Sequence, residues 1–325
     1  MSENRRNFFR NAGAAAAAAA LAPLVSGSAA ADEGRHEGFI KNVLKARIID
    51  LSHTWDENSP IASVNPFYEM HLEATHQNTR GTFGDGGKLS FTSEVQHFSG
   101  QHGAPSIDAI GHIGRKGKLY GGVDAAQATS DPRGIGRDAA HTGAHLDIDH
   151  YAPELLVNRG VLLDVASFIN KNGTPLANNV NIDDEMLAAT AKHQGVRLKR
   201  GDTVLIRTGW AQYFSSSPGT YAGPNSAGVG VDGARFLVKS GARVVGNDTL
   251  TFEFRPPTVG TFGQPDFEVF PVHMLVIADN GINIIENYNL EELAAAKEYE
   301  FVLVVPPLKI RGGTGSALRS FALVP

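Results

Sequence analysis

The sequence contains no cysteine in 325 residues. This absence excludes a disulfide framework, a thiolate nucleophile and a cysteine-ligated zinc site. Long basic runs are also lacking, and the formal net charge is −5. We therefore expect no nucleic-acid partner and no attraction to an anionic membrane surface. The 42% hydrophobic and 19% charged residues are ordinary for a globular protein.

A long apolar run is found only near the N-terminus. Residues 4–10, NRRNFFR, resemble the twin-arginine export motif, and an apolar run from Ala12 to Val25 follows. Small residues at 28–31 then offer a cleavage site. We expect residues 1–31 to be a signal peptide, residues 32–325 to form the mature domain without a membrane anchor, and the protein to be periplasmic or exported. The alternative is an N-terminal anchor, for which the run is short.

Strand-like and helix-like segments are mixed along the mature chain. Continuous apolar runs predict buried strands at 159–165 and 201–208. Further strands are expected at 46–51, 67–72, 88–98, 242–246, 274–278, 283–285 and 301–305, and helices at 33–46, 181–194, 233–240 and 290–296. There is no regular βαβ alternation and no internal repeat. This pattern predicts a single α/β domain with a mixed sheet.

One segment, residues 101–112 with the sequence QHGAPSIDAIGH, concentrates chemically useful side chains. Its glycines and proline predict a bent loop or an irregular strand. His102, Ser106, Asp108 and His112 are at even positions, and alternate side chains of an extended chain share a face. Imidazole and carboxylate are ligands of Zn²⁺ or Mn²⁺. We predict a metal-activated water with a histidine proton shuttle; the alternative is a polar turn whose histidines cap backbone groups.

Two further pairs of residues are candidates for the same site. His53 and Trp55 alternate after a predicted strand, so they either face a pocket together or end a strand at the surface. His273 and Glu286 lie on two predicted strands that a turn at residues 280–281 would bring together. A glutamate after two isoleucines could lie inside and would then need a partner. The alternative for this pair is a solvent-facing rim.

Two other motifs are weaker. Residues 228–233, GVGVDG, match the dinucleotide pattern G-x-G-x-x-G, which requires a buried strand before it and a helix after it. The preceding residues, 218–227, form a polar segment broken by prolines, so we interpret the glycines as a loop that leads into a helix. His141, His145 and Asp147 offer metal-ligand chemistry, but we favour the alternative, a loop and helix start with surface histidines.

These residues together resemble the metal-dependent cyclase-like hydrolases, the family of bacterial kynurenine formamidase and isatin hydrolase. The family pattern is H-x-G-T-H-x-D-x-P-x-H, and Asp108 matches its aspartate, His102 its first histidine and His112 its last. The resemblance continues through residues 49–53, 117–122, 159–165, 201–210, 246–249 and 273–293. It implies a swivelling β/β/α fold, a small-molecule substrate and, as is usual in the family, a homodimer.

The resemblance also implies roles for individual residues. In the family, the first two histidines and the aspartate of the pattern bind metal, the last histidine handles protons, and a later histidine and glutamate complete a second metal site or line the pocket. Carried over, the metal ligands are His102, Asp108, His273 and Glu286, and the proton shuttle is His112. The substrate contacts we expect are His53, Trp55 and Ser106.

The sequence departs from the family pattern at Ser106, which stands where the second histidine belongs. A neutral hydroxyl is a weaker zinc ligand than imidazole. The metal then shifts towards the downstream ligands, recruits Gln101 or His97, or is absent. The implied function is a Zn- or Mn-dependent hydrolase of a cyclic amide, an N-formyl aryl amine (arylformamidase-like) or a lactone. The alternative, which Ser106 motivates, is a non-catalytic exported small-molecule-binding protein on the same fold.

Overall fold

The computed structural model describes residues 37–101, 103–137 and 145–325. The chain divides into a short N-terminal unit that ends at Ala46 and a second unit, Arg47–Pro325. Within the first unit, residues 37–45 are helical, in agreement with the helix predicted over 33–46. No helix in the described part of the chain has both the length and the apolar character needed to cross a bilayer.

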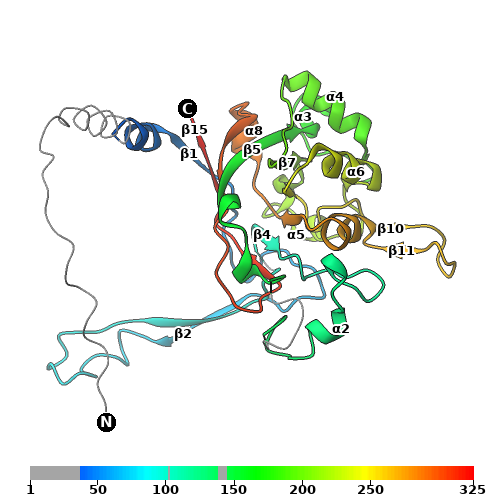
Figure 1. Cartoon of the computed structure of the whole chain (residues 1–325). Coiled ribbons are helices and arrows are strands. Elements are labelled where there is room, and N and C mark those ends of the chain that lie inside the picture. Colours follow the sequence, from blue (N-terminus) through cyan, green and yellow to red (C-terminus); the bar gives the residue numbers. More distant parts are fainter. Residues whose placement is uncertain (1–36, 102, 138–144) are drawn as a thin grey trace, which may run out of the picture. The chain divides into compact units, whose positions relative to one another are not determined.

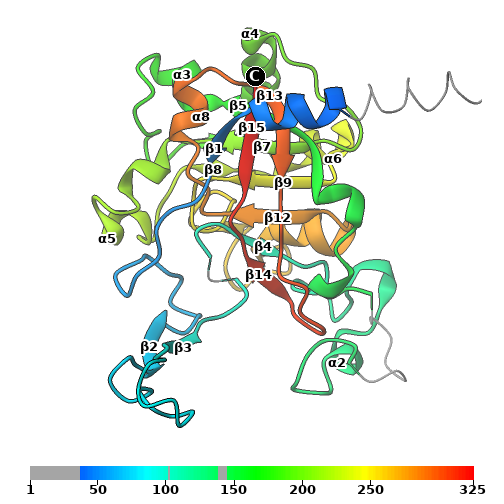
Figure 2. The same cartoon turned by 90° about the vertical axis from the view of Figure 1, so that its left-hand side faces the viewer.

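A mixed sheet forms the centre of the second unit and confirms the predicted α/β class. Its strand order is β1-β15-β13-β5-β7-β9-β12-β4-β14. Four central neighbours run parallel, namely β5 (Val157–Asp164), β7 (Thr203–Arg207), β9 (Val244–Asn247) and β12 (Asn283–Glu286). The other members pair antiparallel, namely β1 (Arg47–Asp50), β4 (Ser106–Asp108), β13 (Glu300–Val304), β14 (Gly315–Ala317) and β15 (Phe321–Val324). Figure 2 shows β9, β12, β4 and β14 following one another down the view.

Both faces of the central strands are buried, which explains their continuous apolar sequences. Alternate residues, such as Val204 and Ile206 of β7, enter one core, and Leu205 enters the other. The first core is covered by α3 (Val165–Asn170), α4 (Asp184–Gln194), α6 (Val231–Ser240), α7 (Pro271–His273) and the π-helical turn η5 (Met274–Asp279). Helices α4 and α6 pack side by side on this face (Figure 1). The second core includes α8 (Glu291–Ala295) and side chains of β1, β13 and β15.

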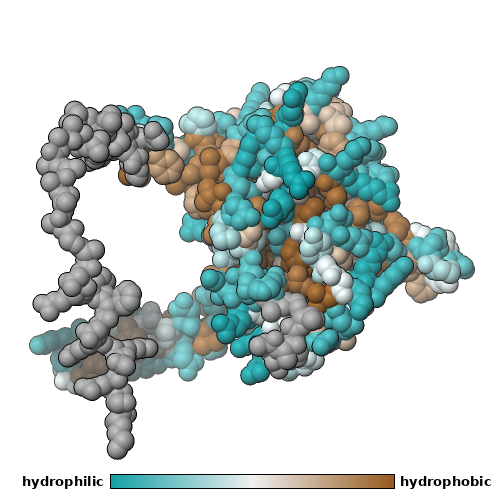
Figure 3. All heavy atoms as spheres, viewed as in Figure 1, coloured by the Kyte–Doolittle hydropathy of each residue, from teal (hydrophilic) through white to brown (hydrophobic). Residues whose placement is uncertain are grey.

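Shorter elements surround the sheet. They are α2 (Ala125–Ala128), α5 (Pro218–Tyr221) and the 3₁₀ turns η1 (Tyr120–Gly122), η2 (Ile148–His150), η3 (Pro153–Leu155) and η4 (Trp210–Tyr213). Three small two-stranded sheets pair β2 (Glu69–Ala74) with β3 (Ser93–His97), β6 (Asn181–Ile182) with β8 (Gly228–Val229), and β10 (Thr258–Val259) with β11 (Glu268–Val269). The face in Figure 3 mixes hydrophilic residues with hydrophobic ones gathered near its middle.

One predicted strand is wrong. The apolar run 274–278 lies in the helical turn η5, which directly continues α7, and not in a strand. A short apolar run is compatible with a buried strand and with a buried helix, and only packing decides between them. The correction matters for the site, because His273 lies on a helical turn that packs against the sheet and not on a strand within the sheet.

A buried ion pair provides a test of the core. The Arg207 guanidinium contacts Asp164 and Glu291 at 2.8 Å each, and the arginine and Asp164 side chains are each 3% exposed. We expect Arg207→Met to lower the free energy of unfolding by about 3–5 kcal/mol, because it leaves a buried carboxylate without a counter-charge. Urea unfolding measures this loss.

The matched control for Arg207→Met is Arg235→Met, which removes an arginine whose pair with Asp232 is 66% exposed on both sides. Exposed pairs contribute less than about 1 kcal/mol. Equal losses in the two variants would contradict the assignment of Arg207 as a stabilising core residue.

Candidate metal and catalytic site

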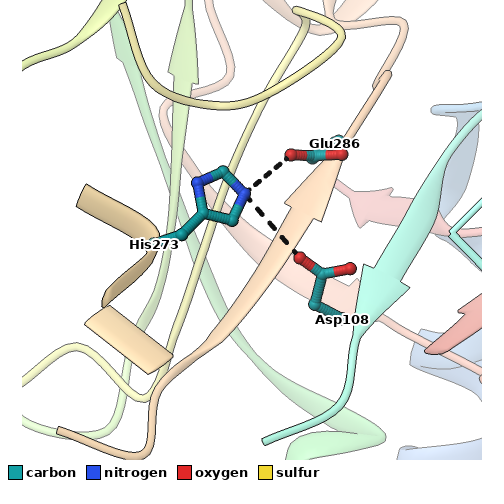
Figure 4. Close-up of side chains that lie close together, drawn as sticks. All are labelled: Asp108, His273 and Glu286. Atoms are coloured by element: carbon teal, nitrogen blue, oxygen red, sulfur yellow. Dashed lines mark hydrogen bonds and ion pairs between the residues drawn. The ribbon is translucent and has the colours of Figure 1, made fainter. Parts of the chain in front are cut away.

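A cavity of about 180 Å³ brings together four of the predicted site residues. Asp108 is the last residue of β4, and His112 lies in the turn that follows. His273 ends α7, and Glu286 ends β12. Figure 4 shows the His273 imidazole directed at the carboxylates of the two strands. The structure therefore joins the upstream motif to the downstream pair, as the resemblance implied.

The side chains of Asp108, His273 and Glu286 lie close enough together to bind one metal ion. His273 Nε2 is 3.2 Å from Glu286 Oε1 and 3.9 Å from Asp108 Oδ2. One ligand atom from each of the three residues lies within 4.8 Å of the others, and all three residues are buried. His112 stands at the border of this group, with Nε2 3.9 Å from Asp108 Oδ1 and its side chain 31% exposed.

Strand register explains why the two carboxylates meet. Ser106 of β4 pairs with Glu286 of β12, and Ile107 pairs with Ile285. Directly opposed residues share a sheet face, as do residues two apart on one strand. Asp108 and Glu286 therefore project from the same face. The Asn283 amide holds this arrangement by donating to the Asp108 carbonyl at 2.7 Å.

The turn that carries His112 depends on a glycine. A Cβ at Gly111 would lie 2.3 Å from the end of the Ile135 side chain and 3.0 Å from the Leu146 carbonyl oxygen, so a larger residue would require the buried Ile135 side chain to move. Gly111 N donates to the Leu146 carbonyl at 2.8 Å, and His112 N donates to the Ala109 carbonyl at 3.0 Å. These contacts fold the chain back after β4 and place the His112 ring at the cavity.

The electrostatics of the cavity favour a bound cation. The pKa of Glu286 is raised to about 7, mainly by burial; the hydrogen bond with His273 opposes this rise, and the charge of Asp108 contributes to it. Burial by itself lowers the pKa of His273, but hydrogen bonds with Glu253 and Glu286 raise it well above 6.5. Three buried carboxylates thus share one imidazole, and buried charges need compensation. Two carboxylates and an imidazole are a donor set that fits a divalent metal.

Glu253 is a residue of this site that the sequence did not reveal. It is 1% exposed, and its carboxylate contacts His273 Nδ1. It belongs to a loop without a recognisable motif, at a distance from His273 along the chain. Only the hydrophobic neighbours of this acidic residue, in the sequence Thr251-Phe252-Glu253-Phe254, hinted that it is buried.

The other predicted site residues lie elsewhere or outside the described chain. Ser106 is buried, and its hydroxyl donates to the Gln101 carbonyl at 3.2 Å. His53 and Trp55 line a separate cavity of about 360 Å³. The substrate contacts of these three residues stay predictions. His102 and His141 fall outside the described residues.

Both weaker motifs fall partly within the described chain, and Asp147 joins Asp149 and His150 in a second group whose possible ligand atoms lie within 4.8 Å of one another. Asp147 accepts a hydrogen bond from Gly312 N at 2.6 Å and contacts His150 Nδ1 at 2.5 Å, which ties a turn to the loop before β14. Gly228 and Val229, expected in a loop, form the short strand β8, which pairs with β6 and precedes α6. This two-stranded pair lies outside the large sheet. Residues 228–233 therefore do not follow a buried strand of that sheet, as a dinucleotide-binding motif requires.

The pKa of His53 predicts a pH dependence of stability. Burial lowers this pKa from 6.5 to about 4, against a smaller opposing effect of a hydrogen bond to the Tyr288 backbone. The unfolded chain therefore binds more protons between these values, and stability is lost as pH falls through this window. From about pH 7 to about pH 5 we expect a loss of about 2 kcal/mol from this group.

A substitution that keeps the ring isolates the His53 effect. The His53 and Phe214 rings stack at 3.9 Å with an interplanar angle of 9°. His53→Phe preserves a stacked ring and removes the titration. Urea unfolding at the two pH values should show a smaller difference for this variant than for the parent. An unchanged difference would mean that other groups cause the pH dependence.

Comparisons with known proteins agree with this fold. Residues 49–254 match the model of the family described as putative cyclase. Isatin hydrolase from Roseibium aggregatum is 30% identical over 132 residues, which cover 38% of this chain and 46% of that protein. The chain thus matches less than half the length of this curated relative.

Solved structures show the same fold. A structure titled as a novel cyclase superposes with a TM-score of 0.72 at 24% identity, covering 89% of this chain and 92% of that one. Isatin hydrolase A from Labrenzia aggregata, bound to benzyl benzoate, gives a TM-score of 0.63 at 21% identity, covering 90% and 99%. Since the family model matches well over half of the sequence, the chain belongs to the putative cyclase family.

Proposed function

We propose that the protein is a metal-dependent hydrolase of a small cyclic amide, an N-formyl aryl amine or a lactone. The observation that carries the proposal is the convergence of Asp108, His273 and Glu286 on one cavity beside His112. The relatives named isatin hydrolase support hydrolysis of a cyclic amide as the reaction class. The departure at Ser106 does not remove this cluster, because none of its three members is the substituted residue.

Asp108, His273 and Glu286 would hold the metal, for which Zn²⁺ and Mn²⁺ are the candidates. A divalent metal in this setting supplies Lewis acidity, which polarises a carbonyl and lowers the pKa of water. His112, at the border of the cavity, accepts a proton from the attacking water and returns it to the leaving nitrogen or oxygen. The hydrophobic wall formed by Ile61, Ile113 and Leu250 limits the water around the substrate.

The experiment is a metal analysis of the purified protein joined to an assay panel. The panel contains isatin, N-formyl aryl amines and lactones, each with Zn²⁺ and with Mn²⁺. We expect about one metal per chain and turnover of at least one substrate class. A reconstituted protein that holds neither metal and turns over none of the panel would overturn the proposal.

A second candidate function is binding without catalysis, and Ser106 is the observation that favours it. Ser106→His restores the family histidine opposite Glu286. If the parent is a hydrolase, we expect this variant to change activity by less than about tenfold, since the three-residue cluster already holds the metal. If metal binding and turnover appear in the variant alone, the parent is the binder. Ser106→Ala is the control for loss of the hydroxyl.

We also propose that the protein acts after export and as a homodimer. The N-terminal motif supports export, and cell fractionation tests it. The β2–β3 hairpin supports self-association because it exposes Met70, Leu72 and Val95, and a second copy could cover them. Light scattering during size-exclusion chromatography should give twice the mass of the chain.

A further inference from the structure

The carboxylate of Glu253 makes all its hydrogen bonds in the described structure to one turn of chain, the turn that carries His273. Oε1 accepts from His273 N at 3.1 Å and contacts His273 Nδ1, and Oε2 accepts from Val272 N at 3.3 Å. Glu253 is 1% exposed and His273 is 4% exposed. A single side chain therefore holds both the backbone and the ring of the residue at the centre of the cluster.

The contact with Nδ1 determines which way the ring presents its lone pair. An ionised carboxylate accepts hydrogen bonds and donates none, so Nδ1 must carry the hydrogen. When the ring is neutral, its lone pair is then on Nε2, the atom 3.2 Å from Glu286 and 3.9 Å from Asp108. Histidines that bind metal characteristically donate their other ring N–H to a carboxylate in this way.

We propose that Glu253 is a positioning residue that fixes the orientation and tautomer of His273, so that Nε2 faces the metal held by Asp108 and Glu286. This inference rests on the proposed metal site. Glu253 does more than cap the turn. Capping would need only the hydrogen bonds from Val272 N and His273 N, and not the contact with the His273 ring.

The glycine motif that resembled a dinucleotide fingerprint fixes the position of Glu253. Val229 N donates to the Phe252 carbonyl and Phe254 N donates to the Val229 carbonyl, each at 3.1 Å, on the two sides of Glu253. A Cβ at Gly228 would lie 2.5 Å from the Glu253 backbone. Glycine is therefore required there for the close approach of the two segments, and the motif serves the site through Glu253.

The main test is Glu253→Gln, which keeps the shape of the side chain and removes its charge. Titration calorimetry with Mn²⁺ and with Zn²⁺ on the metal-free protein, well below its melting temperature, measures affinity for the folded chain. We expect a 10–100-fold weaker Kd, the loss typical for outer partners of a metal ligand. A Kd within twofold of the parent value would show that Glu253 only stabilises the turn.

Asp202→Asn is the control. Asp202 is also a buried carboxylate that accepts a backbone N–H, from Lys199 at 2.6 Å, but its side-chain partner is Arg159. Both variants lose one buried carboxylate charge. We expect Asp202→Asn to leave the Kd for metal unchanged. Equal losses of affinity in both variants would overturn the specific role of Glu253.

A measurement without metal separates this inference from the proposed function. In ¹⁵N NMR of the metal-free protein, we expect a protected ring proton on His273 Nδ1 far downfield, identified by its loss in His273→Gln. Glu253→Gln should move this signal upfield or abolish it, and its persistence at the parent position would overturn the inference. If the parent binds neither metal, the proposed metal site fails, and the NMR result still decides whether Glu253 orients the ring.

Gly228→Ala offers a further variant that leaves every charge in place. Its Cβ should displace the backbone of Glu253, so the downfield signal and the affinity for metal should change in the same direction as in Glu253→Gln. Gly219→Ala is the control, because a Cβ there meets no atom within 4 Å. A Gly228→Ala protein that folds with an unchanged ring signal and Kd would contradict the role of the glycine motif.

Discussion

Asp108→Asn is expected to abolish stoichiometric metal binding and to lower kcat/KM by more than about 100-fold. Loss of an outer partner alone costs up to about 100-fold in affinity or activity, and Asp108 is placed to bind the metal directly. The amide keeps the volume of the side chain, and the Asp108 backbone keeps its pairing with Gly315 on β14. Metal content and steady-state kinetics measure the two effects.

The stability of the metal-free Asp108→Asn protein gives an internal check. The Asp108 charge raises the pKa of Glu286, which means that the two carboxylates repel each other. Removing one charge should therefore leave the metal-free protein at least as resistant to urea as the parent. Asp202→Asn serves again as the control with normal metal content. A folded Asp108→Asn protein with full metal content and parental activity would disprove the assignment of Asp108.

His112→Asn is expected to lower kcat by about 10²–10⁴-fold while metal content stays at the parental level. This range is typical for the loss of a general acid–base group. His112 is 3.9 Å from Asp108 and partly exposed at the cavity, so it can exchange protons with solvent between turnovers. Asparagine preserves hydrogen bonding but does not transfer protons near neutral pH.

The comparison of His112→Asn with His193→Asn controls for general effects of losing a histidine. His193 lies in the last turn of α4, away from the cavity. Substrates with better leaving groups should rescue His112→Asn in part, because they need less protonation as they depart. A loss of metal together with activity would instead make His112 a metal ligand, and equal activity with the parent would remove it from the mechanism.

The central sheet could be predicted because its strands are buried on both faces. Such strands have continuous apolar sequences, and β5 and β7 were found from this signal alone. The strands β14 and β15 were not predicted, since β14 is three residues long with small side chains and β15, although apolar, has only four residues. The run 274–278 was assigned to the wrong element because its composition suits a helix and a strand equally.

The sequence predicts those site residues that lie close together along the chain, but not those that only folding brings together. Asp108 and His112 share one segment whose spacing is informative, whereas the link to His273 and Glu286 came from the family resemblance. Glu253 could not be found in this way, because its role arises only when the loop after β9 packs against α7. His53 and Trp55 alternate along the chain as predicted, yet they line a different cavity.

The order of the strands has a consequence for how the protein matures. Asp108 enters the sheet early in the chain and Glu286 late, and their strands β4 and β12 are direct neighbours. The residues between them supply the three other parallel strands of the sheet. A metal can therefore be captured only after the whole centre of the protein has assembled, and its binding then opposes unfolding by RT ln(1 + [metal]/Kd). The metal bound per chain at saturating metal would accordingly report the correctly folded fraction of a preparation, independently of any substrate.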